Sequence, residues 1–410
     1  MTAKARKRRS PGEGSAWAYK LKSGAERWAI GYVRLMPDGT RKSVTRRGYP
    51  TKQAALKALR ETLTAADKGE LVDPSRQLVS AYLEEWLDGL RLAPSTMASY
   101  RKNVRLHLVP YIGAAQLAQL TTARINAVYR ELERSGRRDH IGERTGEALS
   151  ARTVRYLHTI LHKALGAAVK SHRLARNPAA DAEPPTAKQA KAPEMHPWNA
   201  DQLAAFLAWS KTASQLHVLW TVLAMTGMRR GECLTLRWRD VDLDAGTVSV
   251  RRSVGVIRVK GEGASIEEGD TKSGRPRVID LDAATVAQLR AYRRERGLMH
   301  LSLARDEALV FGDHEGAHRH PERVSRTFRG EQARCRKTLG EAAPPAIRLH
   351  DLRHTHATLL LQAREPVHVV SQRLGHANAT ITLAVYAHVM PGNQRQAADT
   401  FARLIGGGQQ

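Results

Sequence analysis

The chain opens with short apolar runs and changes, after about 70 residues, to helical spacing. Aromatic and β-branched residues gather at positions 16–21, 27–35 and 41–49, and a Pro-Asp-Gly segment divides the last two runs. Short runs separated by turn residues predict a three-stranded antiparallel meander. Thr51 then stands at a helix start, and the leucines behind it recur on one helical face. We therefore expect residues 1–70 to form a basic tail and a small sheet covered by one helix.

Helical spacing dominates residues 74–176. From Val79 onward, apolar residues recur at intervals of three and four, as in an amphipathic helix. Three more such segments follow the candidate N-caps Ser95, Thr122 and Ser150. Together they predict a compact all-α bundle. Its polar faces carry basic residues that form either a solvated surface or a phosphate-binding surface: Arg101, Lys102, Arg105, Arg152, Arg155 and Lys163.

A proline-rich segment separates this bundle from the rest of the chain. Residues 177–197 contain five prolines and almost no bulky apolar side chain, which predicts an extended linker. Residues 198–392 mix helical periods with three strand-like runs, at 247–252, 256–260 and 277–281. Residues 393–410 add a short apolar stripe on a tail with little protein left to cover. The predicted fold class is multidomain: a small α+β unit, an all-α bundle, and a mainly α domain with a small antiparallel sheet.

The charge of the chain points to a polyanionic partner. Lys and Arg number 66 against 40 Asp and Glu, which leaves a formal net charge of +26. This excess is larger and more one-sided than solubility requires. It is spread along the whole chain and not gathered on one amphipathic segment, which favours a nucleic acid over a membrane surface. The basic face of the bundle is accordingly interpreted as a phosphate-binding surface.

The cysteine and apolar content exclude several other classes of protein. Cys233 and Cys335 lie far apart in unlike surroundings, so neither a disulfide framework nor a cysteine-based zinc site is predicted. No run of about 18 apolar residues occurs, and no apolar segment follows the basic N-terminus. We expect a cytoplasmic, nucleoid-associated protein that makes no membrane contact.

Two motifs bring arginines to helix ends. Arg229 follows a Thr-Gly-Met turn that breaks an apolar helix, and it either pairs with Glu232 to tie two helices together or binds an anion. Further on, Arg353 shares one helix face with a histidine three residues before it. An oxyanion suits this face better than a metal ion, because a guanidinium would lie beside the cation without a clear carboxylate ligand. The metal alternative would use His350, His354 and His356.

Three further residues complete a recognisable order. Lys272 lies in Thr-Lys-Ser-Gly-Arg before a strand, His376 in Leu-Gly-His, and Tyr386 ten residues later on a predicted short helix. A lone tyrosine at helical spacing is usually a core residue. In company with the Thr-Gly-x-Arg turn and the His-x-x-Arg helix, however, these elements resemble the tyrosine recombinases, or phage-type integrases. The resemblance covers the whole chain and is sharpest in the last domain.

The resemblance implies a domain order and a set of site residues. It implies an arm-type DNA-binding domain in residues 1–70, a SAM-like core-binding domain in residues 74–176, a catalytic domain in residues 198–392 and a protomer-contacting tail in residues 393–410. The implied catalytic residues are Arg229, Lys272, His350, Arg353, His376 and Tyr386, with Glu232 orienting the first arginine.

The chemistry of a phosphodiester agrees with these residue types. The two arginines offer planar donor forks to the non-bridging oxygens, where charge develops in the transition state. Tyr386 would attack the phosphorus, and its weakly nucleophilic phenol needs either nearby cations or a base. Lys272 would protonate the departing 5′ oxygen. The sequence contains no P-loop motif and no convincing carboxylate cluster for two metals, so no cofactor or ATP is expected.

The resulting prediction is a site-specific DNA recombinase that integrates and excises a mobile element through a 3′-phosphotyrosyl intermediate. Expected partners are double-stranded attachment sites of core and arm type, a homo-tetramer on DNA, an excisionase or other directionality factor, and a host DNA-bending protein. Two alternatives stay open: an enzyme resembling type IB topoisomerases, and a non-catalytic architectural DNA-binding protein.

Overall fold

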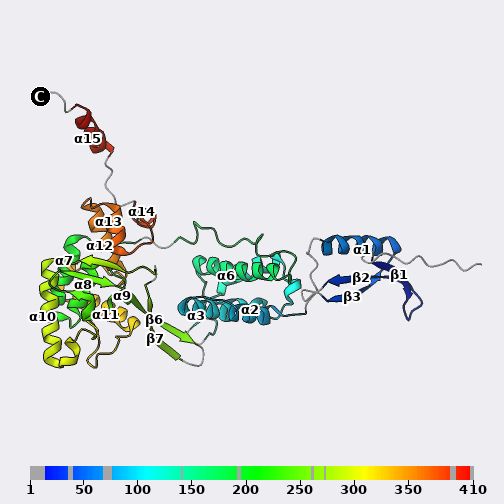
Figure 1. The fold of residues 1–410 in the computed structure, drawn as a ribbon, viewed down its shortest axis with the longest axis horizontal. Coiled ribbons are helices and arrows are strands. Elements are labelled where there is room, and N and C mark those ends of the chain that lie inside the picture. The colour runs from blue at the N-terminus through cyan, green and yellow to red at the C-terminus, as the bar shows by residue number, and fades with distance from the viewer. Residues whose placement is uncertain are drawn as a thin grey trace, which may run out of the picture. The chain divides into compact units, whose positions relative to one another are not determined.

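The computed structural model describes residues 14–35, 40–67, 76–139, 142–191, 195–259, 263–271, 274–387 and 394–406. Its contacts divide the chain into two compact units, Met1–Ala192 and Pro193–Gln410. Figure 1 shows both units and labels many of their helices and strands.

A three-stranded antiparallel sheet begins the first unit. The strands β1 (Ser15–Lys20), β2 (Glu26–Leu35) and β3 (Arg41–Tyr49) pair in that order, which confirms the predicted meander. The helix α1 (Lys52–Asp67) covers one face and buries Ala55 and Leu59 against β2 (Figure 1). The basic tail lies outside the described residues.

The helical bundle of the first unit contains the four predicted segments. These are α2 (Val79–Asp88), α3 (Pro94–Asn103), α5 (Thr122–Ser135) and α6 (Ala151–Lys170), whose apolar faces form one core. A π-helical turn, a short α4 and a 3₁₀ turn connect the second and third of these helices: Val104–Leu108, Val109–Ile112 and Leu117–Gln119.

Two of the three predicted caps of the bundle are wrong by one or two positions. Ser150 does cap α6, accepting from the backbone of Thr153. The cap of α5 is Thr121 instead of Thr122. Ser95 lies inside α3, because Pro94 already occupies the first helical position, where proline's fixed φ and missing N–H are tolerated.

The predicted linker is partly packed. Ala179 is fully buried against the bundle. The Thr122 hydroxyl donates to the carbonyl of Pro178 over 2.8 Å, and Arg155 Nη1 donates to the carbonyl of Pro185 over 2.9 Å. The prediction of an extended linker from residue 177 is therefore wrong for its first part, because backbone carbonyls find donors on α5 and α6 even where side chains are small.

The second unit is mainly helical. Its principal helices are α7 (Ala200–Ala213), α8 (His217–Thr226), α9 (Arg230–Cys233), α10 (Ala283–Met299), α11 (Pro321–Leu339), α12 (Asp351–Gln362), α13 (Val367–Leu374), α14 (Ala379–Tyr386) and α15 (Gln394–Gly406). Three short 3₁₀ turns also lie among the described residues of this unit: Trp238–Asp240, Leu301–Ala304 and Gly340–Ala342.

Two small antiparallel sheets belong to the second unit. One sheet orders β4 (Val241–Asp242), β5 (Thr247–Val250) and β8 (Arg277–Asp280), and the other is a hairpin of β6 (Arg252–Val259) and β7 (Gly263–Asp270). The predicted runs correspond to β5, β6 and β8. The sequence analysis missed β7, whose residues show no apolar alternation and are mostly exposed.

A single hydrophobic core supports this unit. Three buried tryptophans, Trp198, Trp220 and Trp238, lie in it, and Phe328 of α11 contacts the first two. A smaller cluster joins α12, α13 and α14 and includes Tyr386. None of the helices in the described part of the chain is long and apolar enough to cross a membrane.

Candidate active site

A left-handed turn places the first arginine. The helix α8 ends at Gly227, whose φ of 63° is readily adopted only by glycine, and α9 begins directly after Arg229. A Cβ at this glycine would lie 2.7 Å from the ring of His356 and 2.9 Å from a methyl group of Leu374. The turn is thus pressed against α12 and α13, and it brings Arg229 to the junction of these helices.

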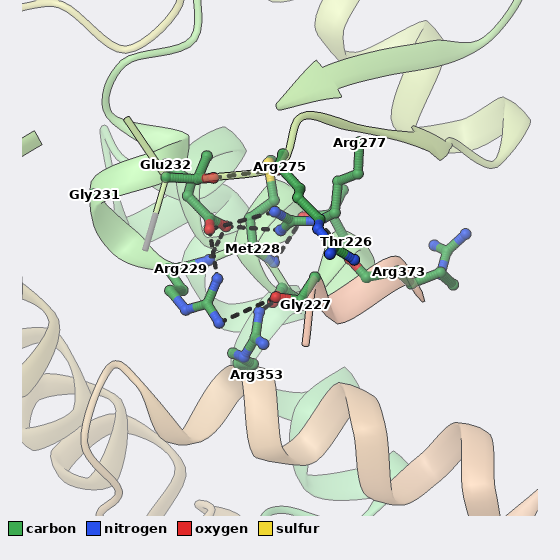
Figure 2. A network of polar contacts seen from close by, with 12 residues as sticks. Thr226, Gly227, Met228, Arg229, Gly231, Glu232, Arg275, Arg277, Arg353 and Arg373 are labelled. Carbon is green, nitrogen blue, oxygen red and sulfur yellow. Dashed lines mark hydrogen bonds and ion pairs between the residues drawn. The ribbon is translucent and has the colours of Figure 1, made fainter. Parts of the chain in front are cut away.

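One buried carboxylate holds two arginines. Glu232 is fully buried, and Arg229 donates to it from its backbone N–H over 2.9 Å and from Nη1 over 2.7 Å. Arg277 of β8 donates to the same carboxylate from Nη2 over 2.7 Å, and it also donates from Nε to the carbonyl of Arg373 (Figure 2). Burial favours the neutral acid, but Arg277 and Arg229 outweigh it and hold the pKa of Glu232 below its usual value.

The second arginine is buried and makes no direct ion pair within the described ranges. Arg353 is only 3% exposed; its Nη1 donates to the Gly227 carbonyl over 2.8 Å, and its Nη2 has no hydrogen-bond partner among the described residues. Burial, followed by the charge of Arg229, lowers the pKa of Arg353 to about 9. Burying a cation costs free energy unless an anion lies against it, so this guanidinium is placed to bind an oxyanion.

Two histidines of the His-x-x-Arg segment lie next to each other. His350 precedes α12, and its ring meets that of His354 edge to face with centroids 5.1 Å apart. His350 keeps exposed surface, yet the protein close around its ring, together with His354 and Arg353, lowers its pKa well below the usual value. It is therefore a neutral hydrogen-bonding group at neutral pH.

Tyr386 closes the site from α14. Its side chain is 2% exposed, and its hydroxyl lies 2.6 Å from Nδ1 of His354. Burial raises the pKa of Tyr386 to about 12, although Arg353 acts in the opposite direction. Of the two ways to activate this phenol that the sequence left open, nearby cations or a base, the cations do not lower its pKa, because the loss of water around the phenol outweighs them.

His376 follows a second left-handed glycine. Gly375 ends α13 with a φ of 66°, and a Cβ there would lie 2.7 Å from Nη1 of Arg277. The next residue, His376, hydrogen-bonds through Nδ1 with the hydroxyl of Thr382 over 2.8 Å. Burial, Arg353 and Arg229 lower the pKa of His376 to about 4, so it too is neutral.

Lys272 lies outside the described residues. The described residues that flank this segment are hydrogen-bonded to each other: the Gly274 N–H donates to the Thr271 carbonyl over 2.8 Å. The strand β7 leads to this segment and is anchored by Glu268, which accepts from Arg237 over 2.9 Å and contacts His318 over 2.6 Å.

A cavity lies beside the site. It has a volume of about 330 Å³ and is lined by residues of the β8 edge, α13 and the loop before α14, including Arg275, Arg277 and His376. Across the described ranges, no group of three or more His, Cys, Asp or Glu side chains is arranged to hold a metal ion. Of the three histidines of the metal alternative, His356 lies apart from the other two: it contacts the Ala224 carbonyl, whereas His354 contacts Tyr386 and the ring of His350.

The basic residues of the bundle are surface residues. All six predicted ones are exposed: Arg101, Lys102, Arg105, Arg152, Arg155 and Lys163. Three already have protein partners: Arg101 pairs with Asp88, Arg155 donates to Pro185, and Lys163 donates to the Tyr100 hydroxyl.

Five of the six predicted catalytic residues lie in the described part of one site, on four separate elements. The charges and rings of Arg229, His350, Arg353, His376 and Tyr386 influence one another. The sequence analysis missed two residues in contact with them. His354 was considered only as a metal ligand, although its place directly after Arg353 was a signal, and nothing in the sequence singled out Arg277.

Comparison with protein-family models gives two matches. Residues 195–392 match the phage integrase family, and residues 78–132 match the N-terminal SAM-like domain of phage integrases.

Individual proteins with known names are similar over most of the chain. A protein of Caldanaerobacter subterraneus described as tyrosine recombinase XerC-like is 24% identical over 94% of this chain and 98% of its own length. An integrase of Streptomyces ambofaciens is 25% identical over 93% of both chains. The putative prophage phiRv2 integrase of Mycobacterium tuberculosis is 27% identical over 79% of this chain and 77% of its own.

Two solved structures share the fold. The Tn1549 transposon integrase in complex with transposon right end DNA has a TM-score of 0.62 at 18% identity, covering 80% of this chain and 99% of that one. A lambda integrase tetramer bound to a Holliday junction has a TM-score of 0.52 at 18% identity, covering 88% of this chain and 96% of that one.

Proposed function

This chain belongs to the phage integrase family of tyrosine recombinases, and we propose that it cuts and rejoins DNA at specific sites through a covalent bond between Tyr386 and a 3′ phosphate. The observation that carries the proposal is the buried Arg353 next to Arg229 and Tyr386, whose Nη2 has no hydrogen-bond partner in the part of the chain that the structure describes. A phosphodiester supplies the anion that this group of side chains lacks.

The residues divide the chemistry among them. Arg229, fixed by Glu232, and Arg353, fixed by the Gly227 carbonyl, bind the non-bridging oxygens and stabilise the charge of the five-coordinate transition state. His350 and His376 are neutral and donate further hydrogen bonds to those oxygens. The phenol oxygen of Tyr386 attacks in line, and Lys272 protonates the 5′ oxygen that leaves.

Resealing needs no nucleotide. The phosphotyrosyl ester keeps the energy of the phosphodiester it replaces, so the 5′ hydroxyl of another strand can attack it directly. The outcome is integration or excision of a mobile element, such as a prophage or an integrative plasmid, and the names of the relatives support this reading.

We propose that the first unit binds DNA through two surfaces, one on the sheet and one on the helical bundle. On the outer face of the sheet, Trp17 is 38% exposed over Gly31, and the Arg47 guanidinium lies over the ring of Tyr19. Aromatic and cationic groups together suit a DNA groove and backbone, which supports an arm-type site. The exposed basic residues of the bundle would contact the core-type site.

Assembly on DNA is proposed to use the C-terminal helix. In α15, Phe401, Leu404 and Ile405 are 67%, 77% and 72% exposed, and such an apolar stripe needs a cover. A neighbouring protomer within a tetramer would supply it. An excisionase and a host DNA-bending protein complete the proposed partners, and comparing integration with excision in purified components would reveal them.

Trapping the covalent adduct tests the proposal. The protein is incubated in EDTA with nicked duplexes tiled across its element's boundary, and SDS-resistant adducts are measured. Wild type should form one, Tyr386→Phe should bind DNA without forming one, and Tyr292→Phe serves as the control because that tyrosine stacks on Phe311 away from the site. Adducts from Tyr386→Phe would refute the assignment.

A second measurement distinguishes a recombinase from an enzyme that resembles type IB topoisomerases. A topoisomerase-like enzyme would relax supercoils as a monomer without exchanging strands between duplexes. We expect joined products from two duplexes, formed only when both carry attachment sites.

A further inference from the structure

A histidine outside the family motif touches the nucleophile. His354 follows Arg353 on α12, and its Nδ1 lies 2.6 Å from the hydroxyl oxygen of Tyr386. The two ring centroids are 5.7 Å apart and the planes are tilted by 52°. Among the residues that the structure describes, His354 is the hydrogen-bond partner of the reacting oxygen.

The direction of the hydrogen bond follows from acidity. A phenol, with an ordinary pKa of about 10, is a far better donor than a neutral imidazole N–H. The Tyr386 hydroxyl therefore donates and Nδ1 of His354 accepts, which leaves the imidazole proton on Nε2. A proton on this phenol already points at a lone pair that can take it.

The surroundings keep that lone pair available. Burial lowers the pKa of His354, Asp351 opposes this effect, and Arg353 and Arg348 add to it, so the ring is neutral at neutral pH. His350 meets the ring edge to face, and His376 also lies within electrostatic reach. Asp351, on the same helix, is the group that would stabilise the imidazolium once a proton arrives.

We infer that His354 is the general base of strand cleavage and the general acid of resealing, an inference that rests on the proposed function. In cleavage, the phenol O–H bond breaks and its proton moves to Nδ1 of His354. The oxygen forms the bond to phosphorus, and the bond to the 5′ oxygen breaks as that oxygen takes a proton from Lys272. In resealing, the 5′ hydroxyl returns its proton to Lys272, and the departing Tyr386 oxygen takes the proton back from His354.

Two variants separate a base from a positioning group. His354→Asn places an amide oxygen near the position of Nδ1, so it can still accept the hydrogen bond but cannot take a proton. His354→Ala removes both properties and leaves space for free imidazole. Loss of a general base slows the chemical step by about a hundredfold to ten-thousandfold, and we expect both variants to show this loss in single-turnover adduct formation.

The pH profile gives a readout that a merely structural role would not change. In wild type, adduct formation should fall only at acid pH, where His354 is protonated, and stay level above that. Without the base, the phenolate must form unaided, so the rate of the Asn variant should rise about tenfold per pH unit over the neutral range. Added imidazole should restore part of the activity of the Ala variant.

The outcomes distinguish this inference from the proposed function. An Asn variant that matches the rate and pH profile of wild type would overturn the role of His354 while the adduct itself upholds the function. No adduct from wild type would overturn both. DNA binding by each variant checks its folding, and if the Ala variant does not fold, the Asn variant alone decides.

Discussion

Replacing Glu232 by Gln tests whether one buried carboxylate organises the site. The substitution keeps the size of the side chain and removes its charge. Glu232 is fully buried and accepts four hydrogen bonds from Arg229 and Arg277, whose side chains are 22% and 9% exposed. The amide NH₂ of Gln would face a guanidinium, so one donor would meet another.

The expected loss is large because both partners stay buried. Removing one member of a buried ion pair costs about 3 to 5 kcal/mol. The matched control is Glu307→Gln, since the pair of Glu307 with Arg239 is exposed, at 70% and 45%, and such pairs contribute about 0 to 1 kcal/mol. Adduct formation by the Glu232 variant should also fall, because Arg229 loses its orienting partner.

Urea unfolding of residues 1–410 at several pH values provides the assay. The pKa of Glu232 is lower in the folded chain than in the unfolded chain. The charged carboxylate therefore contributes to the free energy of unfolding above the usual glutamate pKa of about 4.3, and this contribution disappears as the pH falls through the lowered value. The difference between wild type and Glu232→Gln should therefore shrink in acid. A loss no larger than that of Glu307→Gln at pH 7 would refute the reasoning.

Three further outcomes are expected. Gly227→Ala should destabilise the chain by about 1 to 3 kcal/mol more than Gly146→Ala in urea unfolding, because both glycines have positive φ but only Gly227 is crowded, and equal losses would contradict this. DNA affinity should fall about a thousandfold or more between 50 and 200 mM salt if six to ten phosphates are contacted, whereas a flat response in a gel-shift titration would argue against the charge argument. Removing residues 394–410 should leave adduct formation on an isolated half-site intact but reduce strand exchange between two sites at least about tenfold, and undiminished exchange would exclude the tail as the protomer contact.

Regular apolar spacing explains why most elements were predictable. The bundle helices α5 and α6 bury one face each, so their periodicity survives in the sequence. The helix ending at Gly227 is buried on most sides, and its continuous apolar run indicated it instead. The strand β7 was not predictable because Ile266 is its only large apolar residue, in a run that contains two glycines and two glutamates. The packing of the first part of the linker was not predictable, because its contacts use the backbone carbonyls of Pro178 and Pro185 and composition does not reveal such contacts.

In the candidate site, too, some features were predictable from the sequence and others were not. Arg229, Arg353 and Tyr386 stand in short motifs, so local sequence indicates them. The contact between His354 and Tyr386 joins residues 32 positions apart, and it depends on how α12 packs against α14. The raised pKa of Tyr386 likewise follows from burial, a property of the packed site that the nearby arginines did not indicate.

The burial of Tyr386 also has a consequence for the fate of a broken strand. A phosphotyrosyl ester can be attacked by a DNA hydroxyl or by water, and both reach the phosphorus opposite the same leaving oxygen. Hydrolysis would free the enzyme and leave a permanent nick, whereas the DNA hydroxyl restores a continuous strand. Tyr386 is only 2% exposed, so under the proposed function we expect the DNA end held in the site to reach the phosphorus more readily than water, which protects the open strand.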